Sequence, residues 1–478
     1  MSDHRFIKMA DSLAFAMPEV ERPRTRIDFY TKLAWMAGCA ALYHVMSCVP
    51  VFGAKISDKP DPLFSWRALD GSNKSALTIN GLAPVFLSAY ILQLLAGAGK
   101  LKVNFFLKND RLLFQNAQKF LSVVLYFLLS VAYMASGFFG TFAELGLFKY
   151  AVVFLQIFLA GVVSTYLCEV VEKGYGLGSG PSLLLASHIL GAVWWQTMGV
   201  SRYTYNAEGS LQYEGALVGI ALNLFTFKEK FAPLREVFFR PERLSVYGFL
   251  ICVATYFSMA YLINMRIDVP IRSSRVRGHR QNFPLRLLYT SVMPLVFLIS
   301  ILSHVQVFAY AIHSLFPNAL LTRLLVQYAE SDVYARKELR LVGGLVYYLI
   351  PTCGLKQTLL SPLRVTVSSL YAFAVTIPFS RAWMNATGAG PRDVLRFFKE
   401  NALVMAGYRE ASMLKELNRI LPTAAWVSAF TITSLALVSS AISSTTLAPA
   451  VVVGAGLTFA TFELIMGENP QMLPPTAS

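Results

Sequence analysis

The chain has 478 residues, of which 55% are hydrophobic and 14% are charged, and its formal net charge is +15. Its mean hydropathy is +0.52. Because a soluble protein carries roughly a quarter charged residues, this composition excludes a soluble enzyme, a disordered chain and a secreted disulfide scaffold. It predicts an all-α membrane protein that crosses the bilayer several times.

Residues 1–32 form a charged segment ahead of the first apolar stretch. They mix acidic and basic residues and contain no continuous apolar core before Leu33, which is not the pattern of a cleavable signal peptide. We therefore expect the first span to serve as an uncleaved insertion signal.

Long intervals without a charged residue predict ten spans. A helix needs about 20 apolar residues to cross the hydrocarbon, and a charge at its centre costs roughly 2.5–3.5 kcal/mol. The charges that bound these intervals lie at 32 and 55, 74 and 100, 119 and 144, 149 and 169, 173 and 202, 243 and 266, 286 and 323, 364 and 381, and 419 and 463. The last interval is about twice the length of one span and favours two helices.

Two further apolar segments, 215–227 and 341–355, are shorter than a membrane span. A segment of this length is typical of an interfacial or re-entrant piece. We therefore exclude both from the count of ten.

Basic residues predict the orientation of the spans. Ten spans put both termini on one side, and loops rich in Lys and Arg face the cytosol. The loop after the second span carries five basic residues against one acid, loop 265–286 carries six arginines against Asp268, and loop 381–419 carries seven basic residues against four acids. The loop on the opposite side, 202–243, is nearly balanced. We therefore expect a cytosolic N-terminal segment and a cytosolic tail at 468–478.

The glycine-rich segment Gly174-Tyr-Gly-Leu-Gly-Ser-Gly180 resembles a nucleotide-binding loop, but Ser179 stands where the last glycine of that motif belongs. It also follows a predicted span instead of a strand, so it predicts a tight turn, with Pro181 opening the next helix.

No catalytic motif and no metal-ligand spacing occurs in the sequence, and the span interiors contain no Asp, Glu, Lys or Arg. Ion-coupled pumps usually keep ionisable groups in their spans. We therefore expect a conduit or scaffold that is not an enzyme and that needs no cofactor or metal.

Five short segments carry a family resemblance. They are Gln93-Leu-Leu-Ala-Gly97, Asn116-Ala-Gln-Lys119, Lys173-Gly-Tyr-Gly-Leu-Gly-Ser-Gly180, Pro270-Ile-Arg-Ser-Ser-Arg-Val-Arg-Gly278 and Glu416-Leu-Asn-Arg-Ile-Leu-Pro-Thr-Ala-Ala425. Their order and their sides of the membrane resemble the pore subunit of the Sec protein translocon, the SecY family, in its eukaryotic alpha-subunit form. The resemblance extends from Pro18 to about Glu463.

The resemblance implies a clamshell of two pseudo-symmetric five-helix halves, 33–201 and 244–467, hinged at the lumenal loop 202–243. It implies a protein-conducting channel of the endoplasmic reticulum membrane that passes nascent polypeptides. A lateral gate between the second and seventh spans would release signal sequences and membrane helices into the lipid. The implied partners are the ribosome and two single-span subunits, beta and gamma. A secondary transporter with inverted repeats and a non-conducting insertase scaffold remain alternatives.

An apolar pore ring is the first site that the resemblance implies. Its positions are Leu82, Phe86, Pro181, Leu185, Val296 and Val453. Such a ring fits around a chain of any sequence and resists ion leak by dewetting. Phe86 and Pro181 depart from the family's aliphatic residues, so we expect a tighter and less symmetric ring.

The resemblance places a lumenal plug at about 61–71, where a short helix ended by a turn is expected, with Arg67 and Lys74 as its basic residues. The alternative for this segment is a solvated lumenal loop. Asn73-Lys-Ser75 is a glycosylation sequon. We expect it to stay unused because it is folded against the plug.

The lateral gate would contain Leu87, Leu129 and His304, so two of three positions that are polar in the family are apolar here. His304 has a second interpretation as an interhelical hydrogen-bonding residue. Ribosomal RNA phosphates would bind Arg272, Arg275, Arg277 and Arg409. The alternative for these arginines is attraction to anionic lipid headgroups.

Overall fold

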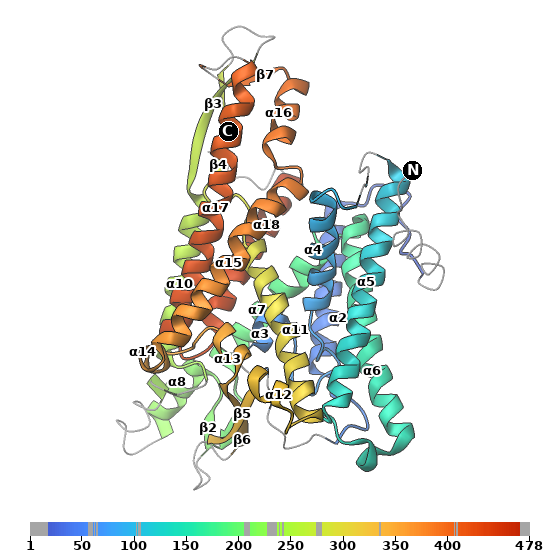
Figure 1. Cartoon of the computed structure of the whole chain (residues 1–478), viewed down its shortest axis with the longest axis vertical. Helices are drawn as coiled ribbons and strands as arrows, with labels where there is room; N and C mark the ends of the chain where they lie inside the picture. Colours follow the sequence, from blue (N-terminus) through green and yellow to red (C-terminus); the bar gives the residue numbers. More distant parts are fainter. Residues whose placement is uncertain are drawn as a thin grey trace.

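The computed structural model describes residues 18–55, 61, 63, 66–101, 103, 107–204, 211–226, 237–238, 240, 243–273, 280–333, 336–405, 407 and 410–468. Ten long helices dominate this part of the chain (Figure 1). They are α2 (Phe29–Cys48), α4 (Ala83–Gly97), α5 (Lys108–Ala135), α6 (Phe142–Val170), α7 (Gly180–Met198), α10 (Val246–Asn264), α11 (Met293–Leu315), α15 (Pro362–Ala386), α17 (Glu410–Ile442) and α18 (Leu447–Glu468).

Each predicted span corresponds to one of these helices, and the long interval 419–463 contains two, α17 and α18. Within the described residues, seven helical segments are long and apolar enough to cross a membrane by themselves, and α2, α4 and α7 complete the set of ten. Helix α4 has only 15 residues because the first part of its uncharged interval forms turns up to Leu82. The ten-helix prediction is confirmed.

The ten helices form two groups of five. Helices α2 and α4–α7 pack together, and so do α10, α11, α15, α17 and α18. Figure 1 shows the first group on the right and most of the second on the left, with α7 and α11 between them. The groups meet where α7 packs on α18, and again where α4 and α5 pack on α11 and α4 also reaches α15. We call this second contact the gate seam.

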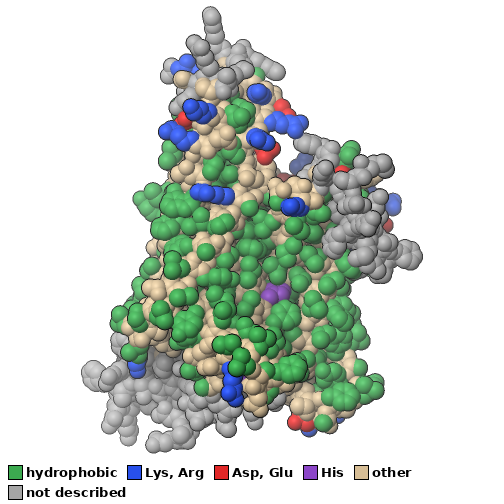
Figure 2. All heavy atoms as spheres, in the orientation of Figure 1, with side chains coloured by type: hydrophobic (Ala, Val, Ile, Leu, Met, Phe, Trp, Pro, Cys, Tyr) green, Lys and Arg blue, Asp and Glu red, His purple; other side chains and the backbone are tan. Residues whose placement is uncertain are grey.

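On the face that Figure 2 shows, charged side chains avoid the middle of the described surface. Figure 2 shows them gathered at the upper end, with a few at the lower end, on either side of a wide hydrophobic band. Such a band is what a bilayer requires, since a charge in the hydrocarbon is costly.

Three small antiparallel sheets lie outside the ten helices in the described residues. They are β1 (Arg202–Thr204) with β2 (Leu211–Tyr213), β4 (Arg280–Arg286) with β3 (Arg266–Ser273) and β7 (Leu403–Met405), and β5 (Gln327–Val333) with β6 (Arg336–Gly343). The chain is therefore mostly helical, and its membrane part is all-α.

Short helices occupy the connections. They are α3 (Arg67–Asp70), the π-helix η1 (Val171–Tyr175), α8 (Ala216–Thr226), α12 (Leu320–Leu325), α13 (Leu345–Leu349), α14 (Leu355–Leu360) and α16 (Pro391–Glu400). Helices α8 and α13 fall in the two short apolar segments, and both are too short to cross the hydrocarbon. The predicted tight turn follows α6, where Gly174 has φ of 106° and Pro181 stands in the first turn of α7.

Candidate functional site

The predicted plug folds back between the two groups of helices. Its helix α3 packs against α7, α11 and α18. Gly71 ends α3 with φ of 75°, a left-handed conformation that glycine adopts without a steric penalty. The Tyr43 hydroxyl of α2 donates to the Gly71 carbonyl at 2.6 Å, and the Leu82 amide donates to the Asp70 carbonyl at 2.9 Å. The predicted short helix ended by a turn is therefore present and is held from both sides.

Arg67 is buried inside this segment, with 7% of its surface exposed. Its Nε donates to Asp61 Oδ2 at 2.6 Å and its Nη2 donates to Asp61 Oδ1 at 2.8 Å. Its Nη1 donates to Ser72 Oγ at 3.2 Å and to the Ile79 carbonyl at 3.3 Å. A buried guanidinium is stable only when it is paired and hydrogen-bonded. Arg67 therefore ties the two ends of the plug together, whereas Lys74 is exposed.

Five of the six predicted ring residues surround the plug. Leu82, Phe86, Leu185, Val296 and Val453 are at most 5% exposed and belong to one continuous hydrophobic cluster. A Cβ atom built on Gly71 would lie 3.2 Å from Leu82 Cδ1 and 3.5 Å from Leu185 Cδ1. The end of α3 therefore contacts α4 and α7 through two ring residues.

The sixth predicted ring residue, Pro181, has different surroundings. It is buried about one turn before Leu185 on α7. There it lines a separate cavity of about 70 Å³ together with Val85 and Ser88 of α4.

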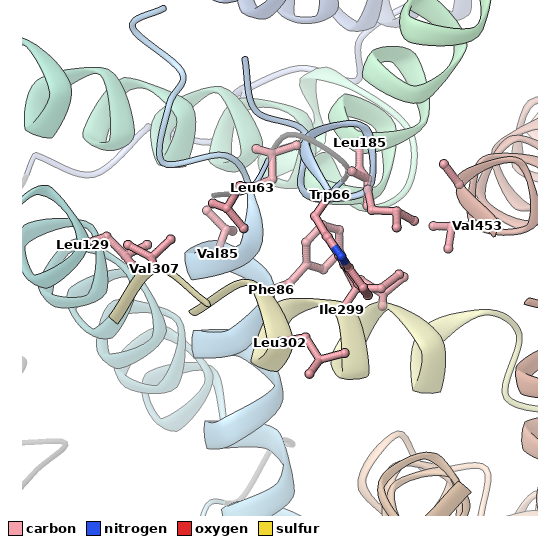
Figure 3. Packing of buried hydrophobic residues seen from close by; sticks show 14 of the residues in the cluster. Leu63, Trp66, Val85, Phe86, Leu129, Leu185, Ile299, Leu302, Val307 and Val453 are labelled. Carbon is pink, nitrogen blue, oxygen red and sulfur yellow. The ribbon is translucent and has the colours of Figure 1, made fainter. Parts of the chain in front are cut away.

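Trp66 also belongs to the hydrophobic cluster, although its packing was not predicted from the sequence. Figure 3 shows it among Phe86, Leu185 and Ile299, and its side chain is 6% exposed. The signals were present: Leu63, Trp66 and Leu69 recur every third residue, and Ile299 follows Val296 at the same spacing. The same spacing of apolar residues occurs on a face that packs against protein and on a face that contacts lipid, so the sequence alone cannot tell which one Trp66 occupies.

A cavity of about 730 Å³, lined by both polar and apolar residues, adjoins the plug. Both groups of helices line it, through residues such as His188 of α7 and Gln306 of α11, and Trp66, Arg67 and Lys74 line it from the plug. This cavity therefore reaches the apolar cluster at Trp66.

The predicted gate residues all lie on helices of the gate seam. Leu87 is half-buried on α4, Leu129 is 3% exposed on α5, and His304 is 6% exposed on α11. Figure 3 shows Leu129 beside Val307 of α11. His304 Nδ1 lies 2.7 Å from the Ser300 carbonyl. The hydrogen-bond partner of this nitrogen is thus on its own helix, not on a neighbour as one interpretation of the sequence expected.

The connection between α7 and α10 is held by two arginines. Arg240 donates to the carbonyls of Tyr213 at 2.8 Å and Glu214 at 3.3 Å, and Arg243 pairs with the Glu214 carboxylate. Burial alone would raise the pKa of Glu214, but hydrogen bonds from Ser201 and Arg243 outweigh it and lower that pKa. This network fixes the connection next to the ends of both helices.

The two predicted basic loops meet in one structure at the upper end of Figure 1. Strand β3 of the first loop pairs with β7 of the second, with Arg272 opposite Val404. A separate hydrophobic cluster supports this sheet, and it includes Ile271, Phe398, Met405 and Leu417. Local sequence patterns could not reveal this pairing, because the two strands are far apart in the chain.

Arg272 is exposed on β3, where a partner can reach it. Arg275, Arg277 and Arg409 lie outside the described residues. Helix α16 adds further exposed basic residues to the same end, namely Arg392, Arg396 and Lys399.

Comparisons with known proteins agree with this geometry. Residues 77–463 match the SecY family, and residues 42–74 match the plug domain of Sec61p, which contains the predicted plug. The chain is 53% identical to the uncharacterized protein C19G7.17 of Schizosaccharomyces pombe, over 99% of each chain. It is 36% identical to the protein transport protein SEC61 subunit alpha of Neurospora crassa, over 89% of this chain and 88% of that one.

A solved structure, that of the idle yeast Ssh1 complex bound to the yeast 80S ribosome, contains a chain similar to this one. The TM-score is 0.75 at 25% identity, over 99% of both chains. The family match covers most of the chain and confirms the resemblance inferred from five short segments. The chain belongs to the SecY family, in its eukaryotic form as the alpha subunit of an endoplasmic reticulum translocon.

Proposed function

We propose that this chain is a protein-conducting channel of the endoplasmic reticulum membrane, through which nascent polypeptides pass. The plug seated inside an apolar ring, between two groups of five helices, carries this proposal. An apolar constriction offers no specific hydrogen bonds to its cargo, so it accepts any sequence, and it resists ion leak when closed.

The gate seam is the proposed exit toward lipid. A signal sequence or a membrane helix separates α4 and α5 from α11 and then enters the bilayer between them. The connection 202–243 serves as the hinge, because it joins the last helix of the first half to the first helix of the second. Apolar contacts such as Leu129 with Val307 suit this role, since lipid or an apolar helix can replace them at little cost.

The basic end of the molecule is the proposed cytosolic face and ribosome-binding surface. The start of α2 and the end of α18 lie together, since Lys32 Nζ is 2.6 Å from Glu468 Oε1, and this supports a shared side for the two termini. The sheet β4–β3–β7 and α16 project arginines and lysines from that end, where ribosomal RNA phosphates and ribosomal proteins would bind. The relative bound to the 80S ribosome supports this assignment. Beta and gamma subunits are the further proposed partners.

Reconstitution tests the function. The purified chain with its small subunits is placed in proteoliposomes and supplied with ribosomes that translate a secretory protein with a strong signal sequence. We expect the product to become protease-protected, and the same protein without its signal to stay accessible. Equal protease sensitivity of both products would contradict the proposed function.

A further inference from the structure

Four aromatic side chains from three helices meet across the gate seam. Tyr90 comes from α4, Phe297 from α11, and Phe379 and Trp383 from α15. The Tyr90 ring centroid lies 5.6 Å from that of Phe297, 5.3 Å from that of Phe379 and 5.1 Å from that of Trp383, and all three pairs are edge-to-face. Aromatic pairs prefer this arrangement because the positive edge of one ring faces the negative face of the other.

The second half of the chain supplies three of these rings as a preassembled cage. Phe297 and Phe379 stack with centroids 4.2 Å apart, and Phe379 stacks on Trp383 at 5.6 Å. Tyr90 enters from the first half and is 2% exposed. Its hydroxyl donates to Met293 Sδ of α11 at 3.4 Å, and sulfur is a weak acceptor. The contacts with the three rings therefore stabilise the position of Tyr90 more than the hydrogen bond of its hydroxyl does.

Helices α4 and α15 touch again two turns further along. Gly97 lies seven residues after Tyr90 and thus on the same face of α4. A Cβ atom built on Gly97 would lie only 2.8 Å from Ala386 Cβ. The close approach at Gly97 and the cage around Tyr90 therefore hold the same two helices together.

Building on the proposed channel function, we propose that Tyr90 in its cage is the lock that sets how hydrophobic a segment must be to open the gate. The apolar contact of Leu129 with Val307 can be exchanged for lipid, whereas the edge-to-face contacts of Tyr90 are lost as soon as the helices separate. A helix that presents an aromatic or leucine side chain can take the place of Tyr90 in the cage. A polar side chain cannot.

The test measures the fraction of a reporter protein that is inserted into the membrane. Each reporter carries a test segment of borderline hydrophobicity, and successive reporters contain one more leucine in that segment. Tyr90→Ala removes the ring, so we expect half-insertion at about one or two fewer leucines than in the wild type. Tyr90→Phe keeps the ring and should leave the threshold unchanged. The matched control is Tyr256→Ala on α10, a tyrosine that is 42% exposed.

A larger side chain between α4 and α15 tests the same lock without changing any residue of the cage. Gly97→Val forces α4 away from Ala386 and should lower the threshold in the same direction as Tyr90→Ala. Gly38→Val on α2 is its control, because a Cβ atom there meets nothing within 4 Å.

A reporter with a strong signal sequence distinguishes a failure of the proposed channel function from a failure of the proposed lock. If the wild type cannot insert this reporter, the channel function is wrong. If the wild type and the variants insert it equally and Tyr90→Ala leaves the threshold unchanged, the lock is wrong. Should Tyr90→Ala fail to accumulate, Gly97→Val decides: a lowered threshold supports the lock, and an unchanged one overturns it.

Discussion

Asp61 and Arg67 form a two-point ion pair beside the apolar cluster, with N–O distances of 2.6 and 2.8 Å. Their side chains are 3% and 8% exposed. The pair is thus removed from water, and each member depends on the other for its stability. This dependence makes the plug sensitive to the loss of either residue.

Arg67→Ala should loosen the plug. The change leaves Asp61 buried without its partner, which costs about 3–5 kcal/mol. We expect higher ion conductance of the resting channel in planar bilayers. Asp61→Ala should act in the same way, and the double variant should leak less than either single one because no buried charge is left unpaired. Wild-type conductance of Arg67→Ala would contradict this account.

Replacing Leu82, Phe86 and Leu185 together by glycine should also raise ion leak, because it widens and weakens the apolar constriction. The control replaces Leu42, Leu250 and Leu370 by glycine. These residues are 47%, 57% and 69% exposed, and each of these changes inside a helix costs about 1 kcal/mol in helix propensity. Equal leak in both triple variants would assign the effect to helix destabilisation and remove these residues from the ring.

Charge reversal in the basic loops should weaken ribosome binding. With Arg272, Arg275, Arg277 and Arg409 changed to Glu, co-sedimentation with ribosomes should fall and its dependence on salt should flatten, since fewer phosphate contacts remain. Membrane insertion of the chain itself should persist. Arg266→Glu is the control, because this exposed residue lies at the opposite end of β3. Unchanged ribosome affinity would leave these arginines with a role in topology alone.

Asn73 should remain unglycosylated. Its side-chain amide donates to the Ser47 carbonyl at 2.9 Å, and the residue is half-buried. Mass analysis of the chain before and after glycosidase treatment checks this expectation. A mass shift that disappears in Asn73→Gln would show that the sequon is accessible.

The charge pattern predicted the membrane architecture well, because each uncharged interval reports directly on contact with hydrocarbon. It divided 419–463 into two helices and set aside 215–227, where an eleven-residue helix is found. It could not predict that α5 begins at Lys108, well before the uncharged interval, because a helix can continue beyond the membrane into water.

Contacts between segments that are far apart in the chain could not be predicted from the sequence. The resemblance placed Leu82 and Val453 by position, and the structure joins them in one cluster. The position of Trp66 depends on how the plug fits between the halves, and the cage of Tyr90 depends on α15, whose pairing with α4 has no local signal. Apolar residues that face a partner and those that face lipid look the same in a membrane helix.

In the proposed channel, a translocating chain passes through the pore ring. A photoreactive amino acid at Leu82 or Val453 tests this directly, with a nascent secretory chain stalled at a length that spans the membrane. We predict that both positions crosslink to the stalled chain and that the outward-facing position Leu250 does not. Crosslinking at Leu250 with none at Leu82 or Val453 would contradict the claim.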